Sequence, residues 1–182
     1  CEEVMIKPSH RKIVIIGNAG SGKTTLALQI QEGLQLPLYH LDQYQWKPHW
    51  VRRDLEEFHA IHNDLLEQEA WIIEGLALKV LRHRILHADV VIFLDISRSR
   101  CIYNVFKRLI VNHGKVIPGN PEDCKQWFNF KMFTFLKWIW DFNKRHRNLV
   151  IDMLNEFEDE KQIFILKSPK EVDDFIKNVI KD

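Results

Sequence analysis

Glycine, lysine and threonine are grouped near the start of the chain, at a spacing suited to holding a phosphate. The stretch reads Gly17, Asn18, Ala19, Gly20, Ser21, Gly22, Lys23, Thr24, Thr25. Glycines permit positive φ and close backbone approach, so that successive N–H groups can point at phosphate oxygens. The lysine is placed to reach the β- and γ-phosphates, and the hydroxyl of Thr24 is placed to ligate Mg²⁺. The pattern predicts that all nine residues bind ATP, with Lys23 also acting in catalysis.

The residues on either side supply the elements that must position this loop. Residues 13–16 form a β-branched run typical of a buried strand, and Leu26, Leu28 and Ile30 follow the loop at helical spacing. A helix from Lys23 to Gly33 would add the positive end of its dipole to the phosphate site. The order strand, loop, helix favours nucleotide binding over an ordinary glycine-rich turn.

Length and composition limit the classes of protein that fit. With 182 residues, 46% of them hydrophobic and 28% charged, we expect a single domain, with a lid or hinge around residues 112–147. No apolar run approaches the ~18 residues of a membrane span, and the formal net charge of +1 argues against a general polyanion binder. Cys1, Cys101 and Cys124 lack a metal-ligand pattern and the N-terminus lacks the apolar core of a signal peptide, so we expect a cytoplasmic location.

Three acids stand where predicted strands end. Asp42 follows residues 37–41, Glu74 follows residues 71–73, and Asp95 follows the apolar run 90–94. In an open α/β sheet, residues at the carboxyl ends of parallel strands face the ligand crevice. Asp42 either orients or deprotonates an acceptor group, holds a Mg²⁺-bound water, or caps a helix. Glu74 is the expected partner of Thr24 in a Mg²⁺ site, with Asp95 as the alternative acid.

Basic and aromatic residues supply further candidates. Arg82 and Arg84 lie on a predicted helix, residues 79–87, where they either clamp an anionic acceptor or form a solvated face. Trp46 belongs to an aromatic loop that either stacks on a planar substrate or packs onto the domain.

The segment 124–147 is the most unusual in composition. Polar residues recur three or four apart on a helix that is otherwise apolar nearly all round: Lys131, Thr134, Lys137, Asp141 and Lys144. Such a helix must be covered on most sides, so we expect a core or lid helix, with Arg145 and Arg147 entering the active site on closure. A homodimer interface and stacking on nucleic acid are the alternatives. Residues 113–121 before it read as a loop or lid hinge.

The remaining pattern completes an alternation of five strands with helices. Helices are predicted over residues 52–69, 98–111 and 171–180, and the last strand over residues 162–166. The sequence therefore predicts an α/β fold.

The motifs together resemble one family. In chain order they are GNAGSGKTTLAL, LPLYHLDQYQWKPHW, WIIEG, ADVVIFLDISRSRC, FLKWIWDFNKRHR and IFILKSPKEVDDF. This combination, which covers nearly the whole chain, resembles the DNA topology modulation (FlaR-like) proteins, which are P-loop proteins related to adenylate kinase. The resemblance implies the fold of nucleoside monophosphate kinases, a five-stranded parallel sheet with the phosphate loop after its central strand.

The resemblance also implies roles for individual residues. It makes the loop the ATP site, Asp42 an acceptor-side acid, Glu74 the metal-side acid, Arg84 an acceptor-anion ligand and Arg108 a phosphate-contacting arginine at the lid base. Two departures stand out. The family usually looks like DGNY where residues 74–77 of this chain read EGLA. Related kinases often have an adenine-stacking arginine at the position of Asn104, which we count among the nucleotide-binding residues.

The expected function is phosphotransfer from Mg²⁺-ATP to an unidentified small-molecule acceptor, with Arg108 and Arg145 assisting Lys23. The alternative is an ATP-binding regulatory protein that affects DNA topology, although no residue pattern supports direct DNA contact. No membrane association is expected, and a homodimer would form through the aromatic helix.

Overall fold

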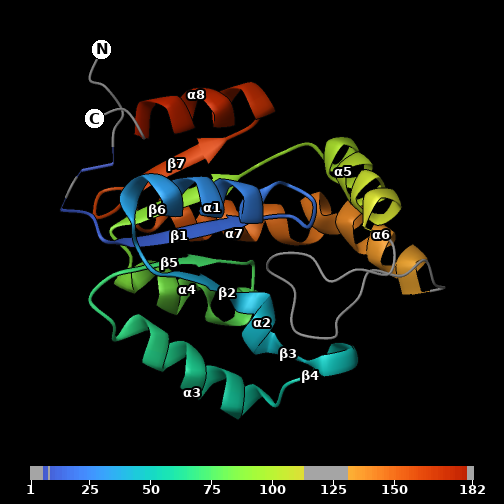
Figure 1. Ribbon diagram of the computed structural model, residues 1–182, viewed down its shortest axis with the longest axis horizontal. Helices are drawn as coiled ribbons and strands as arrows, with labels where there is room; N and C mark the ends of the chain where they lie inside the picture. Colours follow the sequence, from blue (N-terminus) through green and yellow to red (C-terminus); the bar gives the residue numbers. More distant parts are fainter. Residues whose placement is uncertain (1–5, 8, 113–130, 180–182) are drawn as a thin grey trace.

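A five-stranded parallel sheet forms the centre of the molecule (Figure 1). The structure, a computed structural model, describes residues 6–7, 9–112 and 131–179. In sheet order the strands are β2 (Leu38–His40), β5 (Trp71–Glu74), β1 (Lys12–Gly17), β6 (Val90–Leu94) and β7 (Gln162–Leu166). The strand that feeds the glycine-rich loop is therefore the central one, and its carboxyl end lies beside those of β5 and β6.

Helices cover both faces of the sheet, which explains the continuous apolar runs of its central strands. One face carries α1 (Lys23–Leu34) and α8 (Pro169–Val179), and the other carries α3 (Leu55–Leu66), α4 (Leu78–His87) and α7 (Asn148–Asn155) (Figure 1). Side chains of β1 alternate between the two layers: Ile13 and Ile15 pack with α1, whereas Val14 and Ile16 pack with α3 and α4. All four are fully buried.

Short elements connect β2 to α3 near the carboxyl end of the sheet. They are α2 (Leu41–Gln45), β3 (Trp46–Lys47), a 3₁₀ turn (Pro48–Trp50) and β4 (Val51–Arg52). The strands β3 and β4 pair antiparallel as a separate two-stranded sheet. This connection places Asp42 in the first turn of α2, next to the end of β2.

Two further helices pack against each other beside the phosphate loop. They are α5 (Arg98–Val111) and α6 (Lys131–Phe142), which a π-helical segment (Asn143–Arg147) joins to α7. π-Helical turns are rare and often mark functional sites. In the described part of the chain, no helix has both the length and the apolar composition needed to cross a bilayer.

The structure confirms the alternation of strands and helices and corrects several boundaries. The strand after α1 is shorter than residues 37–41, and the helix α1 continues through Gly33 and ends where Gln35 adopts a left-handed φ of 54°. The helix α3 begins at Leu55, not at residue 52, because the Asp54 side chain caps it by accepting hydrogen bonds from two backbone N–H groups. Arg52 belongs to β4 instead.

The aromatic helix is only partly covered. Ile139 and Phe142 are buried, but Phe133 is 73% exposed and Trp140 is 46% exposed. The prediction that its apolar residues are covered on most sides is therefore wrong for these two. Residues 113–130, which hold the predicted hinge and the start of the aromatic segment, lie outside the described residues.

Candidate active site

The phosphate loop connects β1 to α1 and is shaped by close contacts with α5. Gly20 has a φ of 78°, and a Cβ atom there would lie 2.3 Å from the main-chain oxygen of Cys101 on α5. Any larger residue would therefore clash with helix backbone. The loop also closes on itself through a hydrogen bond from the Ser21 N–H to the Asn18 carbonyl at 3.2 Å.

The lysine and threonine that end the loop are turned toward its interior and toward β5. Lys23 Nζ donates to the Asn18 carbonyl at 3.0 Å, so its ammonium group lies against its own loop. Thr24 Oγ1 donates to Glu74 Oε1 at 3.1 Å. The structure thus brings together the predicted phosphate lysine, the predicted metal hydroxyl and one of the two candidate acids.

A histidine that the sequence analysis did not single out joins this group. His40 ends β2 directly opposite Glu74 in the β2–β5 register, and its Nδ1 lies 2.7 Å from Glu74 Oε1. A carboxylate oxygen only accepts, so Nδ1 carries the proton of this bond. His40 belongs to the HLD motif, which was a signal in the sequence. Its contact with Glu74 depends on β2 and β5 being neighbours in the sheet, and the order of strands cannot be read from the sequence.

Glu74 is nearly buried, with 5% of its surface exposed. Burial by itself raises the pKa of this carboxyl, but the hydrogen bond from His40, the charge of Lys23 and the hydrogen bond from Thr24 outweigh it and lower the pKa below its usual value. Glu74 is therefore ionised at neutral pH despite its burial.

These oxygens fit a Mg²⁺ ion. A hydroxyl and a carboxylate are hard ligands of the kind that Mg²⁺ takes in small number, with water and substrate phosphates completing its shell. Among the described residues there is no group of three or more His, Cys, Asp or Glu side chains suited to a metal, so Thr24 and Glu74 would hold the ion together with phosphates and water.

The alternative acid, Asp95, has a different partner. Arg147 binds it in a bidentate pair, with Nε 2.8 Å from Oδ1 and Nη2 2.6 Å from Oδ2. The pair connects the end of β6 to the π-helical segment. Arg147, predicted to reach a substrate, is therefore committed to Asp95 in this structure, and Thr24 meets Glu74 instead.

Asp42 faces the same group from α2. Its side chain is exposed to solvent, with protein atoms crowded around it. This crowding raises the pKa of Asp42, Glu74 raises it further, and Lys23, Arg108 and His40 partly offset the rise. Arg108 of α5 is half-buried, and burial lowers its pKa against the opposing effect of Asp42. Asp42 and Arg108 therefore belong to one electrostatic cluster with Lys23.

Arg84 lies beneath the segment that follows β5. It is fully buried, and its Nη2 donates to the carbonyls of Gly75 at 2.8 Å and Leu76 at 3.0 Å. Burial lowers its pKa to about 9, opposed by Glu74. The interpretation of Arg84 as part of a solvated face is wrong. As an anion ligand it would need an opening, because its guanidinium is closed off from solvent here.

Two other candidate residues, Arg145 for catalysis and Arg82 for acceptor binding, pair with acids outside this cluster. Arg145 is exposed, and its Nη2 lies 3.6 Å from Asp141 Oδ2 on the same stretch of helix. Arg82 is also exposed and pairs with Glu156 at 3.0 Å. Trp46 is half-buried at the start of β3, in the hairpin that follows α2.

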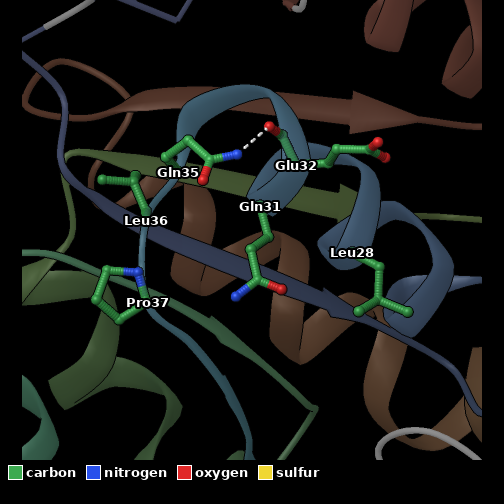
Figure 2. Close-up of a pocket in the computed structure, with 6 residues that line it drawn as sticks. All are labelled: Leu28, Gln31, Glu32, Gln35, Leu36 and Pro37. Carbon is green, nitrogen blue, oxygen red and sulfur yellow. Dashed lines mark hydrogen bonds between the residues drawn. The ribbon is translucent and has the colours of Figure 1, made fainter.

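A surface hollow lies at the opposite end of α1 from the phosphate loop (Figure 2). It is lined by Leu28, Gln31, Glu32, Gln35, Leu36 and Pro37. Gln35 Nε2 donates to the main-chain oxygen of Glu32 at 2.6 Å across this end of the helix. With one acidic side chain and no basic one in its lining, the hollow adds no group to the candidate site.

Solved structures resemble this chain over nearly its whole length. A shikimate kinase from Acinetobacter baumannii in complex with shikimate has a TM-score of 0.61 at 12% identity, covering 93% of this chain and 90% of that one. A gluconokinase from Sinorhizobium meliloti 1021 has a TM-score of 0.53 at 15% identity, covering 94% and 90%. A sugar kinase from Janibacter sp. HTCC2649 has a TM-score of 0.52 at 15% identity, covering 92% and 91%.

No model of a protein family and no curated protein matches the chain. The structural likeness shows that the chain has the α/β fold of P-loop kinases, a parallel five-stranded sheet flanked by helices. It does not show the FlaR-like family.

Proposed function

We propose that the chain transfers the γ-phosphoryl group of Mg²⁺-ATP to a hydroxyl group of a small molecule. The observation that carries the proposal is the connected group Thr24, Glu74 and His40 beside Lys23, with Asp42 facing it. A candidate metal site, a candidate phosphate-binding cation and a separate carboxylate would thereby meet at the carboxyl end of the sheet, where ligands of open α/β folds bind.

The donor half of the reaction would depend on the phosphate loop. Its backbone N–H groups and the start of α1 would bind the β- and γ-phosphates, and Lys23 would exchange its bond to the Asn18 carbonyl for phosphate oxygens. Bound Mg²⁺ would supply charge neutralisation at these phosphates. Glu74, ionised by its own hydrogen bonds, would orient the ion together with Thr24.

Asp42 would act on the acceptor. A carboxylate whose pKa is raised is a better base than an ordinary aspartate, so Asp42 is suited to take the proton of an acceptor hydroxyl. The new bond forms between the acceptor oxygen and the γ-phosphorus, and the bond from that phosphorus to the β–γ bridging oxygen breaks, releasing ADP. Arg108, in the electrostatic range of Asp42, would balance the negative charge that gathers there.

A hydroxyl acceptor is favoured over an acceptor phosphate because of Arg84. The predicted anion ligand has no surface exposed to solvent. Its Nη2 donates to two carbonyl groups, and its Nε and Nη1, which have no hydrogen-bond partner among the described residues, are buried with it and closed off from an acceptor. The kinases that share the fold support a small-molecule acceptor in general, and their own substrates are not transferred to this chain.

Membership of the FlaR-like family remains part of this proposal, resting on the HLD and WIWDFNKRHR motifs. An effect on DNA would need a surface of its own. An affinity for DNA that falls steeply with salt and changes with ATP would favour the alternative, an ATP-binding regulatory protein that affects DNA topology, over the kinase.

An acceptor screen tests the kinase directly. Purified protein is incubated with Mg²⁺-ATP and a panel of hydroxyl compounds, nucleosides and nucleoside monophosphates, and ADP release is followed for the wild type and for Lys23→Ala. Lys79→Ala, an exposed lysine of α4, is the matched control. We expect turnover with at least one hydroxyl compound, retained in the control and lost in Lys23→Ala. Turnover no greater than that of Lys23→Ala across the panel would refute the proposal.

A further inference from the structure

Asn18 turns its side chain toward α6. Its Nδ2 donates to the main-chain oxygen of Ile139 at 3.0 Å, and its Oδ1 accepts from the N–H of Ala19 at 2.8 Å. Only 2% of the Asn18 surface is exposed, and Ile139 is fully buried. One asparagine therefore fixes the local turn of the loop and also joins it to a helix more than a hundred residues away.

A second asparagine holds the opposite side of the loop. Asn104 of α5 donates from Nδ2 to the main-chain oxygen of Gly20 at 2.9 Å. The same part of α5 presses on Gly20, where the Cys101 oxygen leaves no room for a Cβ atom. The side-chain amide of Asn104, predicted to bind nucleotide, is therefore hydrogen-bonded to the backbone of the loop.

The two helices that provide these contacts are themselves joined. The guanidinium of Arg98, at the start of α5, lies 3.9 Å from the ring centre of Trp140 on α6. Such a cation–π contact is favourable because the face of the indole ring attracts the guanidinium charge. On α6, the rings of Phe135 and Trp138 stack nearly parallel, with centroids 6.4 Å apart. The loop is therefore held between two helices that contact each other.

We propose that Asn18 and Asn104 are positioning residues that hold the phosphate loop between α6 and α5 and so set its affinity for nucleotide phosphates. The proposal rests on the proposed function, because it assumes that the loop binds a nucleotide. A loop already fixed in its binding shape loses less conformational freedom on binding. By reciprocity, a nucleotide that orders the loop stabilises the contact with α6.

The test compares Asn18→Ala and Asn104→Ala with the wild type in two measurements. The first is the affinity for ADP in the presence of Mg²⁺, by calorimetry. The second is hydrogen exchange of the peptide around Ile139 with and without Mg²⁺-ADP. Asn155→Ala, an exposed asparagine at the end of α7, is the matched control. Melting temperatures without nucleotide separate general destabilisation from loss of affinity.

We expect each variant to bind ADP about fivefold more weakly than the wild type, since each removes one hydrogen bond that holds the loop. ADP should slow exchange around Ile139 in the wild type, and this protection should be lost in Asn18→Ala. Lower melting temperatures with unchanged ADP affinity would show a merely structural role and overturn the proposal. Absence of ADP binding by the wild type would instead refute the proposed function itself.

Discussion

The phosphate loop and the segment after β5 both follow the carboxyl end of a buried strand, yet they are held in different ways. The phosphate loop owes its shape to residue types within it, the glycines and Asn18, and to helix backbone beside it. Residues 75–77 have one glycine, and Ala77 adopts a left-handed φ of 31°. The carbonyls of Gly75 and Leu76 accept hydrogen bonds from Arg84, which comes from the following helix.

The difference shows how far the shape of each region is specified by local sequence. The phosphate loop, built from local residue types, can be recognised in the sequence, and several hydrogen bonds and close contacts hold its shape. The segment after β5, supported by one buried arginine, depends instead on how the following helix packs beneath it. We therefore expect substitutions at different places in the site to fail differently: in chemistry and metal binding at Asp42 and Glu74, and in stability at Arg84.

The largest effect is expected for Asp42→Asn. It removes the proposed base while leaving the phosphate loop intact, so kcat should fall by about 10² to 10⁴-fold and ADP affinity should change little. Steady-state rates with an acceptor found in the screen measure this, and Asp64→Asn, an exposed aspartate of α3, is the control. A kcat within threefold of the wild type would remove Asp42 from the reaction.

Next comes the choice of metal-side acid. Glu74→Gln should lower the apparent affinity for Mg²⁺ in the activity assay by about 10–100-fold, so that more Mg²⁺ is needed for half-maximal activity. This range is typical for loss of a group that orients a bound metal. Asp95→Asn should change this affinity less than threefold, because Asp95 is paired with Arg147. Titration of activity with Mg²⁺ measures both variants, and the reverse order of effects would make Asp95 the metal-side acid.

Arg84 and Arg82 form a matched pair on α4, one fully buried and the other exposed. Arg84→Met should lower the free energy of unfolding by about 2 kcal/mol, since two buried carbonyls lose a charged donor. Arg82→Met should cost less than about 1 kcal/mol, as expected for an exposed ion pair. Urea unfolding measures both changes, and equal losses would contradict the supporting role of Arg84.

A comparable change in stability, confined to acid pH, is expected from His62 of α3. Burial lowers the pKa of His62 to about 3, with Arg84, His83 and His59 adding in the same direction. Neither ring nitrogen has a hydrogen-bond partner among the described residues. The unfolded chain therefore binds more protons than the folded one between about pH 6.5 and pH 3, so stability is lost as the pH falls through this range.

The slope of this loss is about 1.4 kcal/mol per pH unit, or roughly 2 kcal/mol at pH 5 relative to neutral pH. His62→Leu should remove this contribution, so its urea midpoint should fall less than that of the wild type between pH 7 and pH 5. An identical pH dependence of the two proteins would show that His62 does not titrate in this way.

The sequence was sufficient for the order of the strands and helices and for the position of the loop between β1 and α1. The strand β6 and the helix α5 have the predicted bounds, because continuous apolar runs and helical spacing are local signals. The central place of β1 followed from the family resemblance and is confirmed.

What the sequence did not specify depends on long-range contacts. The contact of His40 with Glu74 depends on the pairing of β2 with β5. Arg84 is fully buried, although the basic composition of the segment KVLRHRILH is typical of a solvated helix face. The bonds of Asn18 to α6 and of Arg147 to Asp95 join residues 121 and 52 positions apart. No local pattern of residues signals such partners.

The central claim is that the loop and Glu74 form one Mg²⁺-nucleotide site. The most direct test is a calorimetric titration with ATP, carried out once in the presence of Mg²⁺ and once with EDTA instead of Mg²⁺. We predict saturable binding by the wild type that is tighter with Mg²⁺, lost in Lys23→Ala, and no longer strengthened by Mg²⁺ in Glu74→Gln. Absence of binding by the wild type, or equal binding by Lys23→Ala, would contradict the account.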